Sequence, residues 1–233
     1  MRLLVTRPEP DGERTAERLR ARGHDVVVAP LLRVDAVDFE FTQETVSAVV
    51  LTSANAARAV ARHPARDALM ALPAFAVGRH TAEAARVAGF LDIRSADGAR
   101  DHLIRLIAAS AGSVGGPLLY LAGEDRAGEL DLAAHGLRVL TVVAYRAVKV
   151  ERMPPDVESA LRRGQFEGVL HFSRRSAQAY LDCAARAGVL DRALAPAQFC
   201  LSAQVSEPLV AAGATAIRIA SRPEEGALIA LLG

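Results

Sequence analysis

Short apolar runs alternate with segments of helical periodicity along the whole chain. The apolar runs are rich in Val, Ile and Leu without clean alternation, which is typical of strands buried on both faces of a parallel sheet. They predict strands at residues 3–6, 26–31, 48–52, 74–77, 92–94, 118–121, 139–144, 168–172, 198–201 and 216–219. Apolar residues at three- and four-residue steps predict helices at 14–22, 55–62, 81–88, 100–109, 129–135, 157–163, 176–187, 206–212 and 225–232. This alternation predicts an α/β fold with a parallel sheet and right-handed crossovers.

The chain also repeats the order of its segments once. Residues 3–30 and 118–144 each read as an apolar run, a helical segment, a glycine and a second apolar run. Three further pairs follow in the same order, namely 52–56 with 173–177, 75–89 with 199–213, and 95–98 with 221–224. A repeat of more than a hundred residues is too long for a solenoid, whose units run to about 20–50 residues. The repeat therefore predicts two similar lobes and a cleft between them.

Two stretches, 33–45 and 146–155, interrupt the alternation. The first carries Asp35, Asp38 and Glu40 without a helical pattern, and the second contains Pro154 and Pro155. Because each stretch follows the second strand of its repeat, we expect both to connect the lobes.

Composition narrows the class of protein. A chain of 233 residues with 51% hydrophobic residues can form one large domain or two of roughly 100–130 residues. The longest apolar stretches fall well short of the ~18 residues that a membrane span needs. The N-terminus turns polar at Thr6 and Arg7, so it does not read as a signal peptide. Cys183 and Cys200 are the only cysteines and form no metal-ligand pattern. We expect a cytoplasmic protein.

Charge argues against nucleic acid as a partner. The formal net charge is +1, and no basic run or stripe is present. Lys149 is the only lysine, so 27 of the 28 basic residues are Arg. Guanidinium groups are suited to bidentate binding of carboxylates.

Polar residues gather where the predicted strands end. Parallel sheets place functional groups at the carboxyl ends of their strands. Those ends hold Thr6-Arg7, Thr52-Ser53, Gly78-Arg79, Ser95, Ser173-Arg174-Arg175, Ser202-Ala203-Gln204 and Ser221-Arg222. Any one Ser or Thr could be an ordinary helix N-cap. Taken together, helix N-termini flanked by arginines predict an extended anion-binding surface.

Other chemistries lack their sequence signals. No phosphate-binding glycine loop follows a predicted strand, and the six histidines have no metal-site spacing. His171 lies inside an apolar run and reads as a core residue. No Ser-His-Asp or Cys-His pattern is visible, so we expect neither a metal nor another cofactor. Tyr145 stands alone at the predicted lobe junction, where either packing or chemistry could explain it.

Together these segments resemble the uroporphyrinogen-III synthase family, in the same order and over the whole chain. The residues that carry the resemblance are 4–8 (Leu-Val-Thr-Arg-Pro), 51–56 (Leu-Thr-Ser-Ala-Asn-Ala), 76–82 (Ala-Val-Gly-Arg-His-Thr-Ala), 142–145 (Val-Val-Ala-Tyr), 172–177 (Phe-Ser-Arg-Arg-Ser-Ala) and 223–224 (Pro-Glu). The chain departs from the family pattern at Ser202, Gln204 and Val205, where a Gly and two Thr are usual, and at Arg175, where Pro is usual.

The resemblance implies a particular architecture. Two similar flavodoxin-like lobes, which arose by internal duplication, are joined by a two-stranded ladder and hold the substrate in the cleft between them. Lobe one would comprise residues 1–34 and 146–233, and lobe two residues 35–145.

The resemblance also implies an activity in tetrapyrrole (haem) biosynthesis. Linear hydroxymethylbilane is cyclised to uroporphyrinogen III with loss of water and inversion of ring D, by a hydro-lyase that needs no cofactor. Tyr145 is the favoured candidate to assist loss of the hydroxyl. The candidate substrate-binding residues are Arg7, Thr52, Ser53, Asn55, Arg79, Thr81, Ser173, Arg174, Ser176, Ser202 and Gln204. We expect a monomer without membrane contact, to which hydroxymethylbilane synthase could transiently hand over its product.

Two other functions fit the same pattern. Two α/β lobes around a cleft also describe a cytosolic protein that binds a polycarboxylate without catalysis. A flavodoxin-like nucleotide binder is disfavoured because the phosphate loop is missing.

Overall fold

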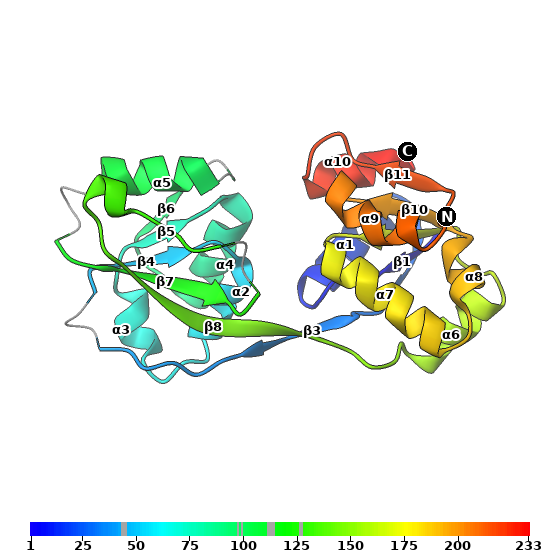
Figure 1. The fold of residues 1–233 in the computed structure, drawn as a ribbon, viewed down its shortest axis with the longest axis horizontal. Helices are drawn as coiled ribbons and strands as arrows, with labels where there is room; N and C mark the ends of the chain where they lie inside the picture. Colours follow the sequence, from blue (N-terminus) through cyan, green and yellow to red (C-terminus); the bar gives the residue numbers. More distant parts are fainter. Residues whose placement is uncertain (43–45, 97, 99, 111–114, 126–127) are drawn as a thin grey trace. The chain divides into compact units, whose positions relative to one another are not determined.

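The computed structural model describes residues 1–42, 46–96, 98, 100–110, 115–125 and 128–233. By internal packing, the chain separates into two compact units (Figure 1). Unit 1 comprises Met1–Arg33 and Val148–Gly233, and unit 2 comprises Val34–Ala147. The chain leaves unit 1 within strand β3 (Leu32–Ala36) and returns to it within strand β8 (Val139–Lys149).

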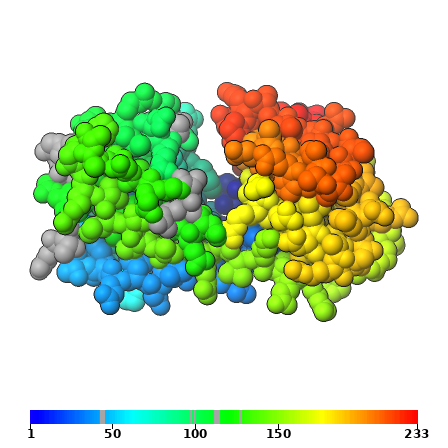
Figure 2. All heavy atoms as spheres, in the orientation of Figure 1, coloured from blue at the N-terminus to red at the C-terminus, as the bar shows by residue number. Residues whose placement is uncertain are grey.

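Unit 1 is built on a five-stranded sheet with the strand order β11-β10-β9-β1-β2. All neighbouring strands in it pair in parallel. The strands are β1 (Arg2–Val5), β2 (Asp25–Val28), β9 (Gly168–His171), β10 (Ala197–Cys200) and β11 (Ile217–Ile219). The helices are α1 (Asp11–Arg20), α6 (Pro155–Arg162), α7 (Arg174–Arg186), α8 (Leu190–Leu194), α9 (Ala203–Ala211) and α10 (Glu225–Ile229), with a 3-10 turn at Ala230–Leu232. On the face seen in Figure 2, the yellow to red surface of unit 1 belongs to the C-terminal part of the chain.

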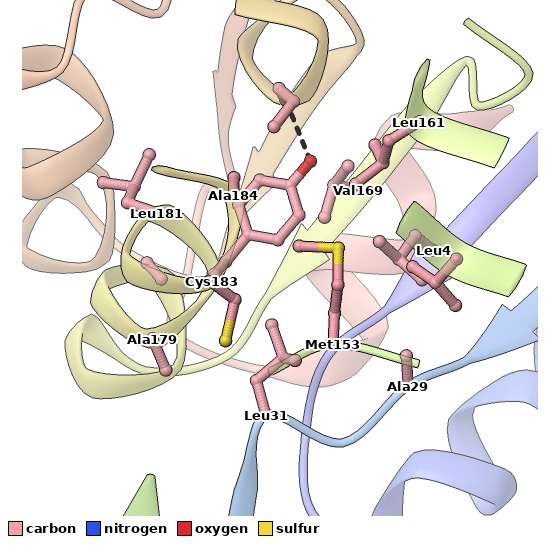
Figure 3. Packing of buried hydrophobic residues seen from close by; sticks show 14 of the residues in the cluster. Leu4, Ala29, Leu31, Met153, Leu161, Val169, Ala179, Leu181, Cys183 and Ala184 are labelled. Atoms are coloured by element: carbon pink, nitrogen blue, oxygen red, sulfur yellow. Dashed lines mark hydrogen bonds between the residues drawn. The ribbon is translucent and has the colours of Figure 1, made fainter. Parts of the chain in front are cut away.

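Both faces of this sheet are covered. Successive residues of a strand point to opposite faces, and β1 divides its side chains accordingly. Leu4 packs in one hydrophobic cluster with Val169 and Cys183 (Figure 3). Leu3 and Val5 belong to a second cluster. This double burial explains why the strands read as unbroken apolar runs.

Unit 2 contains a six-stranded sheet with the strand order β3-β8-β7-β4-β5-β6. The strands not yet given are β4 (Ala48–Leu51), β5 (Ala74–Ala76), β6 (Ile93–Ser95) and β7 (Leu118–Gly123). The helices are α2 (Ala54–Val60), α3 (Arg66–Met70), α4 (Arg79–Ala88) and α5 (Arg100–Ala109), with a 3-10 turn at Ala133–His135. Here too β4 serves two cores, with Val49 and Leu51 in one cluster and Ala48 and Val50 in the other.

Strand β3 joins the edge of this sheet in the antiparallel sense. The N–H of Val37 donates to the carbonyl of Ala144 at 2.8 Å, and the N–H of Val150 donates to that of Leu31 at 3.1 Å. Residue numbers therefore increase along β3 as they decrease along β8, which is the antiparallel pattern. The other strand pairs of unit 2 are parallel.

The two sheets have corresponding strand orders. Read from one edge, β11, β10, β9, β1 and β2 of unit 1 correspond to β6, β5, β4, β7 and β8 of unit 2. The predicted α/β fold with parallel sheets is thus confirmed. Its origin by internal duplication stays a prediction.

The helix expected at 129–135 is wrong. Only Ala133–His135 form a 3-10 turn, in which the N–H of Ala133 bonds to the carboxylate of Asp131 at 2.9 Å. Leu130 and Leu132 are buried while the residues beside them are exposed, so the segment follows the two-residue period of an extended chain. The short elements α3, α8 and β3 were not predicted. The two helices span only five residues each, too few to show a helical period, and β3 alternates with polar residues instead of forming an apolar run. No helix among the described residues has the length and apolar character needed to cross a membrane.

Candidate functional site

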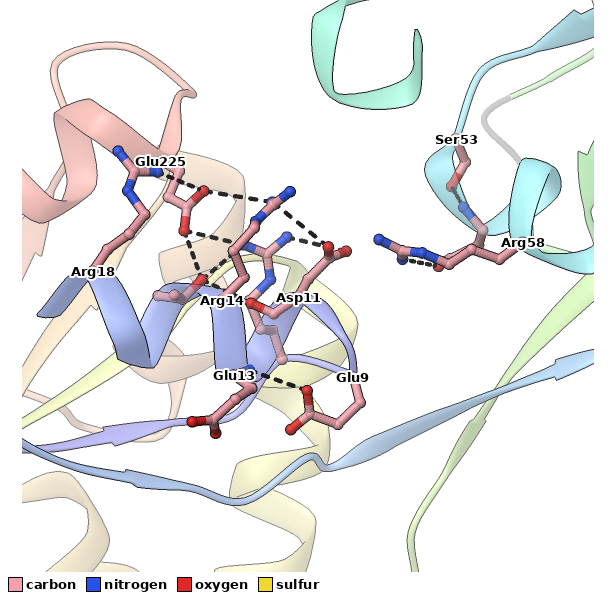
Figure 4. A network of polar contacts seen from close by, with 11 residues as sticks. Glu9, Asp11, Glu13, Arg14, Arg18, Ser53, Arg58 and Glu225 are labelled. Atoms are coloured by element: carbon pink, nitrogen blue, oxygen red, sulfur yellow. Dashed lines mark hydrogen bonds and ion pairs between the residues drawn. The ribbon is translucent and has the colours of Figure 1, made fainter. Parts of the chain in front are cut away.

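In unit 2, Thr52 and Ser53 follow β4 at its carboxyl end, as predicted. Ser53 has extended backbone angles (φ −149°, ψ 143°), and its Oγ accepts the N–H of Asn55 at 3.2 Å. Ser53 is therefore the N-cap of α2. Asn55 lies in the first turn, and its Oδ1 accepts a hydrogen bond from Arg58 at 2.9 Å (Figure 4).

Tyr145 is brought to the same end of the sheet by a β-bulge. Ala122 of β7 pairs with Val143 of β8, but the next residue, Gly123, pairs with Tyr145. Ala144 is thus the extra residue of β8, and such bulges re-aim the side chains that follow them. The main chain of Tyr145 is fixed there because its carbonyl accepts the N–H of Glu124 at 2.9 Å.

Four hydroxyl groups meet at this point, which we call the hydroxyl cluster: those of Thr52, Ser53, Tyr120 and Tyr145. The Ser53 side chain lies within hydrogen-bonding reach of the Tyr145 phenol. The phenol of Tyr120 lies 3.0 Å from Oγ1 of Thr52. The sequence analysis missed Tyr120, which is only 4% exposed. Its signal was a phenol in an otherwise aliphatic strand, since a buried phenol needs a polar partner.

The electrostatics of the cluster keep Tyr145 protonated. Burial raises the pKa of the Tyr145 phenol above its usual value, the hydrogen bond from Ser53 acts in the opposite direction, and the nearby Tyr120 adds to the rise. The half-buried phenol therefore stays protonated at neutral pH and can donate a proton there.

Helix α4 offers the second predicted group of unit 2. Gly78 precedes the helix in an extended conformation, and Arg79 is its first residue. The Arg79 side chain is exposed, and no hydrogen bond or ion pair is recorded for it within the described part of the chain. Thr81 lies in the same first turn but is only 4% exposed. Arg79 is thus the predicted cation best placed to receive an outside anion.

In unit 1, Ser173 and Ser176 close a capping box at the start of α7. The N–H of Ser176 donates to Oγ of Ser173 at 3.1 Å, and the N–H of Ser173 donates to Oγ of Ser176 at 3.3 Å. Both hydroxyls thereby satisfy main-chain donors of the helix terminus. The neighbouring Arg174 is exposed and pairs with Glu207 at 3.2 Å.

Ser202 and Gln204 lie at the start of α9. Ser202 is the N-cap residue with extended angles (φ −157°, ψ 170°), but its side chain makes no capping hydrogen bond. Gln204 is exposed, while Val205 is 5% exposed and packs in the core. The departure from the family pattern at Val205 therefore falls on a core-facing position.

Arg7 follows β1 but is held by partners of its own unit. Its guanidinium lies 3.5 Å from the carboxylate of Asp11 and 3.6 Å from that of Glu225. It also lies over the ring of Phe172, 4.2 Å from the centroid, and donates to the hydroxyl of Thr15 at 3.1 Å. The role of Arg7 as a substrate ligand stays a prediction.

Glu225 and Asp11 also bind further side chains of α1. Arg7, Asp11, Arg14, Thr15, Arg18 and Glu225 together form what we call the ion network of unit 1 (Figure 4). Glu225 accepts from Thr15 at 2.6 Å and lies 3.0 Å from Arg18. Arg14 lies 3.7 Å from Glu225 and 3.5 Å from Asp11. Asp11 and Glu225 are the first residues of α1 and α10, where a negative charge is favourable.

His171 is a core residue, as expected. It is fully buried, and its Nε2 lies 2.9 Å from Oε1 of Gln198. Because an amide oxygen only accepts, Nε2 carries the proton. Burial lowers the pKa of His171 to about 4, although the hydrogen bond to Gln198 partly opposes this.

The other reactive side chains of unit 1 are unsuited to catalysis. Cys183 and Cys200 are buried, and burial raises the pKa of Cys200 to about 12, so that thiol is inert. Among the described residues, no group of three or more His, Cys, Asp or Glu could hold a metal ion. An open pocket of about 490 Å³ is lined by Arg152, Met153, Glu158, Cys183, Arg186 and Ala187. It contains none of the predicted site residues.

Comparison with known protein families assigns the chain to a family. The family model described as uroporphyrinogen-III synthase HemD matches residues 13–230. The chain belongs to the uroporphyrinogen-III synthase family. It is therefore an enzyme of porphyrin and haem biosynthesis, of the hydro-lyase class, as the resemblance implied.

Solved structures agree on the fold. The chain is similar to the uroporphyrinogen-III synthetase of Helicobacter pylori, with 18% identity and a TM-score of 0.66 over 100% of this chain and 98% of that one. It is also similar to a mutant uroporphyrinogen III synthase of the extremely thermophilic bacterium Thermus thermophilus, with 16% identity and a TM-score of 0.51 over 100% of this chain and 97% of that one. No curated protein matched the sequence.

Proposed function

We propose that this chain cyclises hydroxymethylbilane to uroporphyrinogen III, and that Tyr145 donates the proton with which the substrate hydroxyl leaves as water. The observation that carries the catalytic assignment is the half-buried phenol of Tyr145, which lies beside Ser53 at the carboxyl end of the unit 2 sheet and whose pKa is raised by burial. Parallel sheets place their chemistry at that end.

The proposed reaction needs one proton donor and a firm hold on the substrate. Protonation of the departing hydroxyl releases water and leaves an electrophilic azafulvenium cation. Closure at the substituted carbon of ring D gives a spiro intermediate, which fragments and recloses with ring D inverted. The proton lost from the pyrrole carbon at the final step balances the proton taken from the phenol. Isomer choice then depends on how the chain ends are oriented, which is a proximity effect.

Binding of the substrate carboxylates falls to helix N-termini and guanidinium groups. Arg79 at the start of α4 supports this part of the proposal best, since its side chain is exposed. Main-chain N–H groups and a guanidinium together make charge-assisted hydrogen bonds to a carboxylate. Thr52, Thr81, Ser202 and Gln204 lie at the same kind of strand end and complete the set in our proposal. A cleft formed by both units stays a prediction.

Isomer analysis tests the proposal. The protein is mixed with freshly prepared hydroxymethylbilane, the products are oxidised to porphyrins, and the type I and type III isomers are separated by chromatography. We expect type III product well above the spontaneous rate. Heat-denatured protein is the control and should give only type I. Type I product at the spontaneous rate with native protein would contradict catalysis and leave a binding protein as the alternative.

A further inference from the structure

The ring of Tyr145 lies directly on the main chain of Gly123. A Cβ atom built on Gly123 would lie 2.7 Å from Cζ of Tyr145, 2.8 Å from its Oη and 3.0 Å from its Cε2. All three distances are at or below the limit that real Cβ contacts respect. Gly123 does not adopt the positive φ that only glycine accepts readily. The reason for a glycine here is therefore the approach of the ring, and not the backbone conformation.

Ser53 holds the other end of that ring. Its Oγ already accepts the N–H of Asn55 at the start of α2. The hydroxyl keeps its own proton, which it can donate to the phenol oxygen of Tyr145. The Ser53 side chain lowers the pKa of Tyr145 against the effect of burial, so it lies within reach of the phenol oxygen.

We propose that Gly123 and Ser53 are positioning residues for Tyr145. Gly123 provides a flat surface that sets the ring, and Ser53 donates a hydrogen bond to the phenol oxygen, so that the phenol proton is directed at the substrate. The hydrogen-bond chain runs from the N–H of Asn55 through Ser53 to Tyr145. As the proton leaves, the Ser53 donor stabilises the phenolate that forms. This inference rests on the proposed role of Tyr145 as the proton donor.

Ser53 variants test the direction of the hydrogen bond without substrate. Ser53→Gly removes the hydroxyl, yet glycine costs a helix N-cap only a few tenths of a kcal/mol. Ser53→Thr keeps the hydroxyl and the cap. The chain contains three tyrosines, so ¹³Cζ-labelled tyrosine gives three resonances, and Tyr145→Phe assigns the relevant one.

We expect the Tyr145 pKa to rise in Ser53→Gly and to return in Ser53→Thr. In Ser53→Gly, kcat should fall about ten- to a hundred-fold with a smaller change in KM, because one hydrogen bond to a group that gains charge is lost. In Ser53→Thr, kcat should return to the wild-type value. An unchanged or lower Tyr145 pKa in Ser53→Gly would overturn the donor role. This titration needs no turnover, so it decides the role of Ser53 even if the chain were to make only type I product.

Gly123→Ala tests the surface under the ring. The new methyl group must displace the phenol, so kcat should fall while KM changes little. Gly116→Ala is the matched control on the same segment, because a Cβ there would lie 3.6 Å from Ser47, an ordinary contact, and its kcat should equal that of the wild type.

Two double variants separate positioning from misfolding. In a Tyr145→Phe background, Gly123→Ala should cause no further loss of kcat, because the phenol it positions is already gone. In a Tyr145→Ala background it should cause no loss of stability, because the ring it would meet is absent. The proposed role of Gly123 would be overturned if Gly123→Ala had the kcat of the wild type. It would also be overturned if Gly123→Ala lowered kcat by the same factor in the Tyr145→Phe background as in the wild type.

Discussion

Ser53 in unit 2 and Ser173 in unit 1 occupy the same place in their sheets but have different surroundings. Ser53 lies after β4 and Ser173 after β9, which are the third strands counted from the β6 edge and the β11 edge. Each serine has an extended conformation and starts a helix. The hydroxyl of Ser173 is engaged by Ser176 in a capping box. That of Ser53 caps α2 and also reaches Tyr145. The same local signal can therefore serve the helix alone or both helix and chemistry, depending on the neighbouring strand.

The same contrast extends to the charged groups. At the strand ends of unit 2, the hydroxyl cluster is neutral and its central phenol is protonated. At those of unit 1, the ion network pairs Arg7 with two carboxylates. In our account unit 2 supplies the proton, and the ion network of unit 1 maintains the packing of α1 and α10.

The largest expected effect is a loss of kcat when the proposed proton donor of unit 2 is removed. Tyr145→Phe removes the proton donor, and general acid assistance is typically worth about 10²–10⁴-fold. We expect kcat to fall by that factor while circular dichroism and the midpoint of thermal unfolding stay close to wild type. Near-wild-type kcat would make Tyr145 a packing residue.

A second prediction concerns the core of unit 1, where His171 is buried and neutral. The unfolded chain binds a proton at His171 near pH 6.5, whereas the folded chain binds it only near pH 4. Between these values the unfolded state binds more protons, so stability is full above pH 6.5 and falls as the pH drops towards 4. The loss should reach about 3 kcal/mol.

Denaturant unfolding between pH 4 and 7 measures this dependence. His171→Gln keeps a donor for Gln198 but cannot titrate in this range, so most of the slope should vanish in that variant. An equally steep slope in His171→Gln would assign the acid sensitivity to other groups.

The third prediction sharpens the structural role of the ion network. Glu225 is largely buried and has four partners in Thr15, Arg7, Arg14 and Arg18. Glu225→Gln should lower the free energy of unfolding by about 1–3 kcal/mol, because the arginines lose their negative partner and one acceptor oxygen becomes an amide donor. Glu207→Gln is the control, since its pair with Arg174 is exposed and worth about 0–1 kcal/mol. Equal losses in the two variants would contradict a special role for the network.

The smallest effect concerns substrate binding at α4. Arg79→Gln should raise KM about two- to five-fold, the range of one exposed ion contact, and the difference should shrink as salt screens the charge. Arg86→Gln on the same helix removes a cation that already pairs with Glu83 at 3.0 Å and should leave KM unchanged. A salt-independent KM in the wild type would show that guanidinium charge contributes little.

Local signals in the sequence predicted the scaffold well. Alternating apolar runs and helical segments located every parallel strand of both sheets. The pattern is clearest in central strands such as β4 and β9, which are buried along their whole length. Ser53 and Ser173 were found at strand ends because an N-cap needs only the residues next to it. The segment 129–135 was misread, since Leu130 with Ala133 and Ala134 fits a helical period, whereas Leu130 with Leu132 fits an extended one.

The contacts that make the site depend on residues far apart in the chain. Arg7 meets Glu225 only because α10 packs beside α1 in unit 1, and no local pattern encodes that meeting. Tyr145 reaches Ser53 through the extra residue Ala144, and a bulge shifts register without a marker in the sequence. Tyr120 was overlooked because its hydroxyl finds Thr52 only once β4 and β7 pair.

Isomer analysis of Tyr145→Phe tests the central claim most directly, because it separates the rate of the reaction from the choice of product. Wild type and variant are incubated with hydroxymethylbilane at equal concentration, and the type III fraction is measured by chromatography above the spontaneous background. Removing one oxygen leaves the substrate-binding groups in place, so we predict slow turnover that still yields type III product. Turnover at the wild-type rate, or enzyme-dependent product that is type I, would contradict the account.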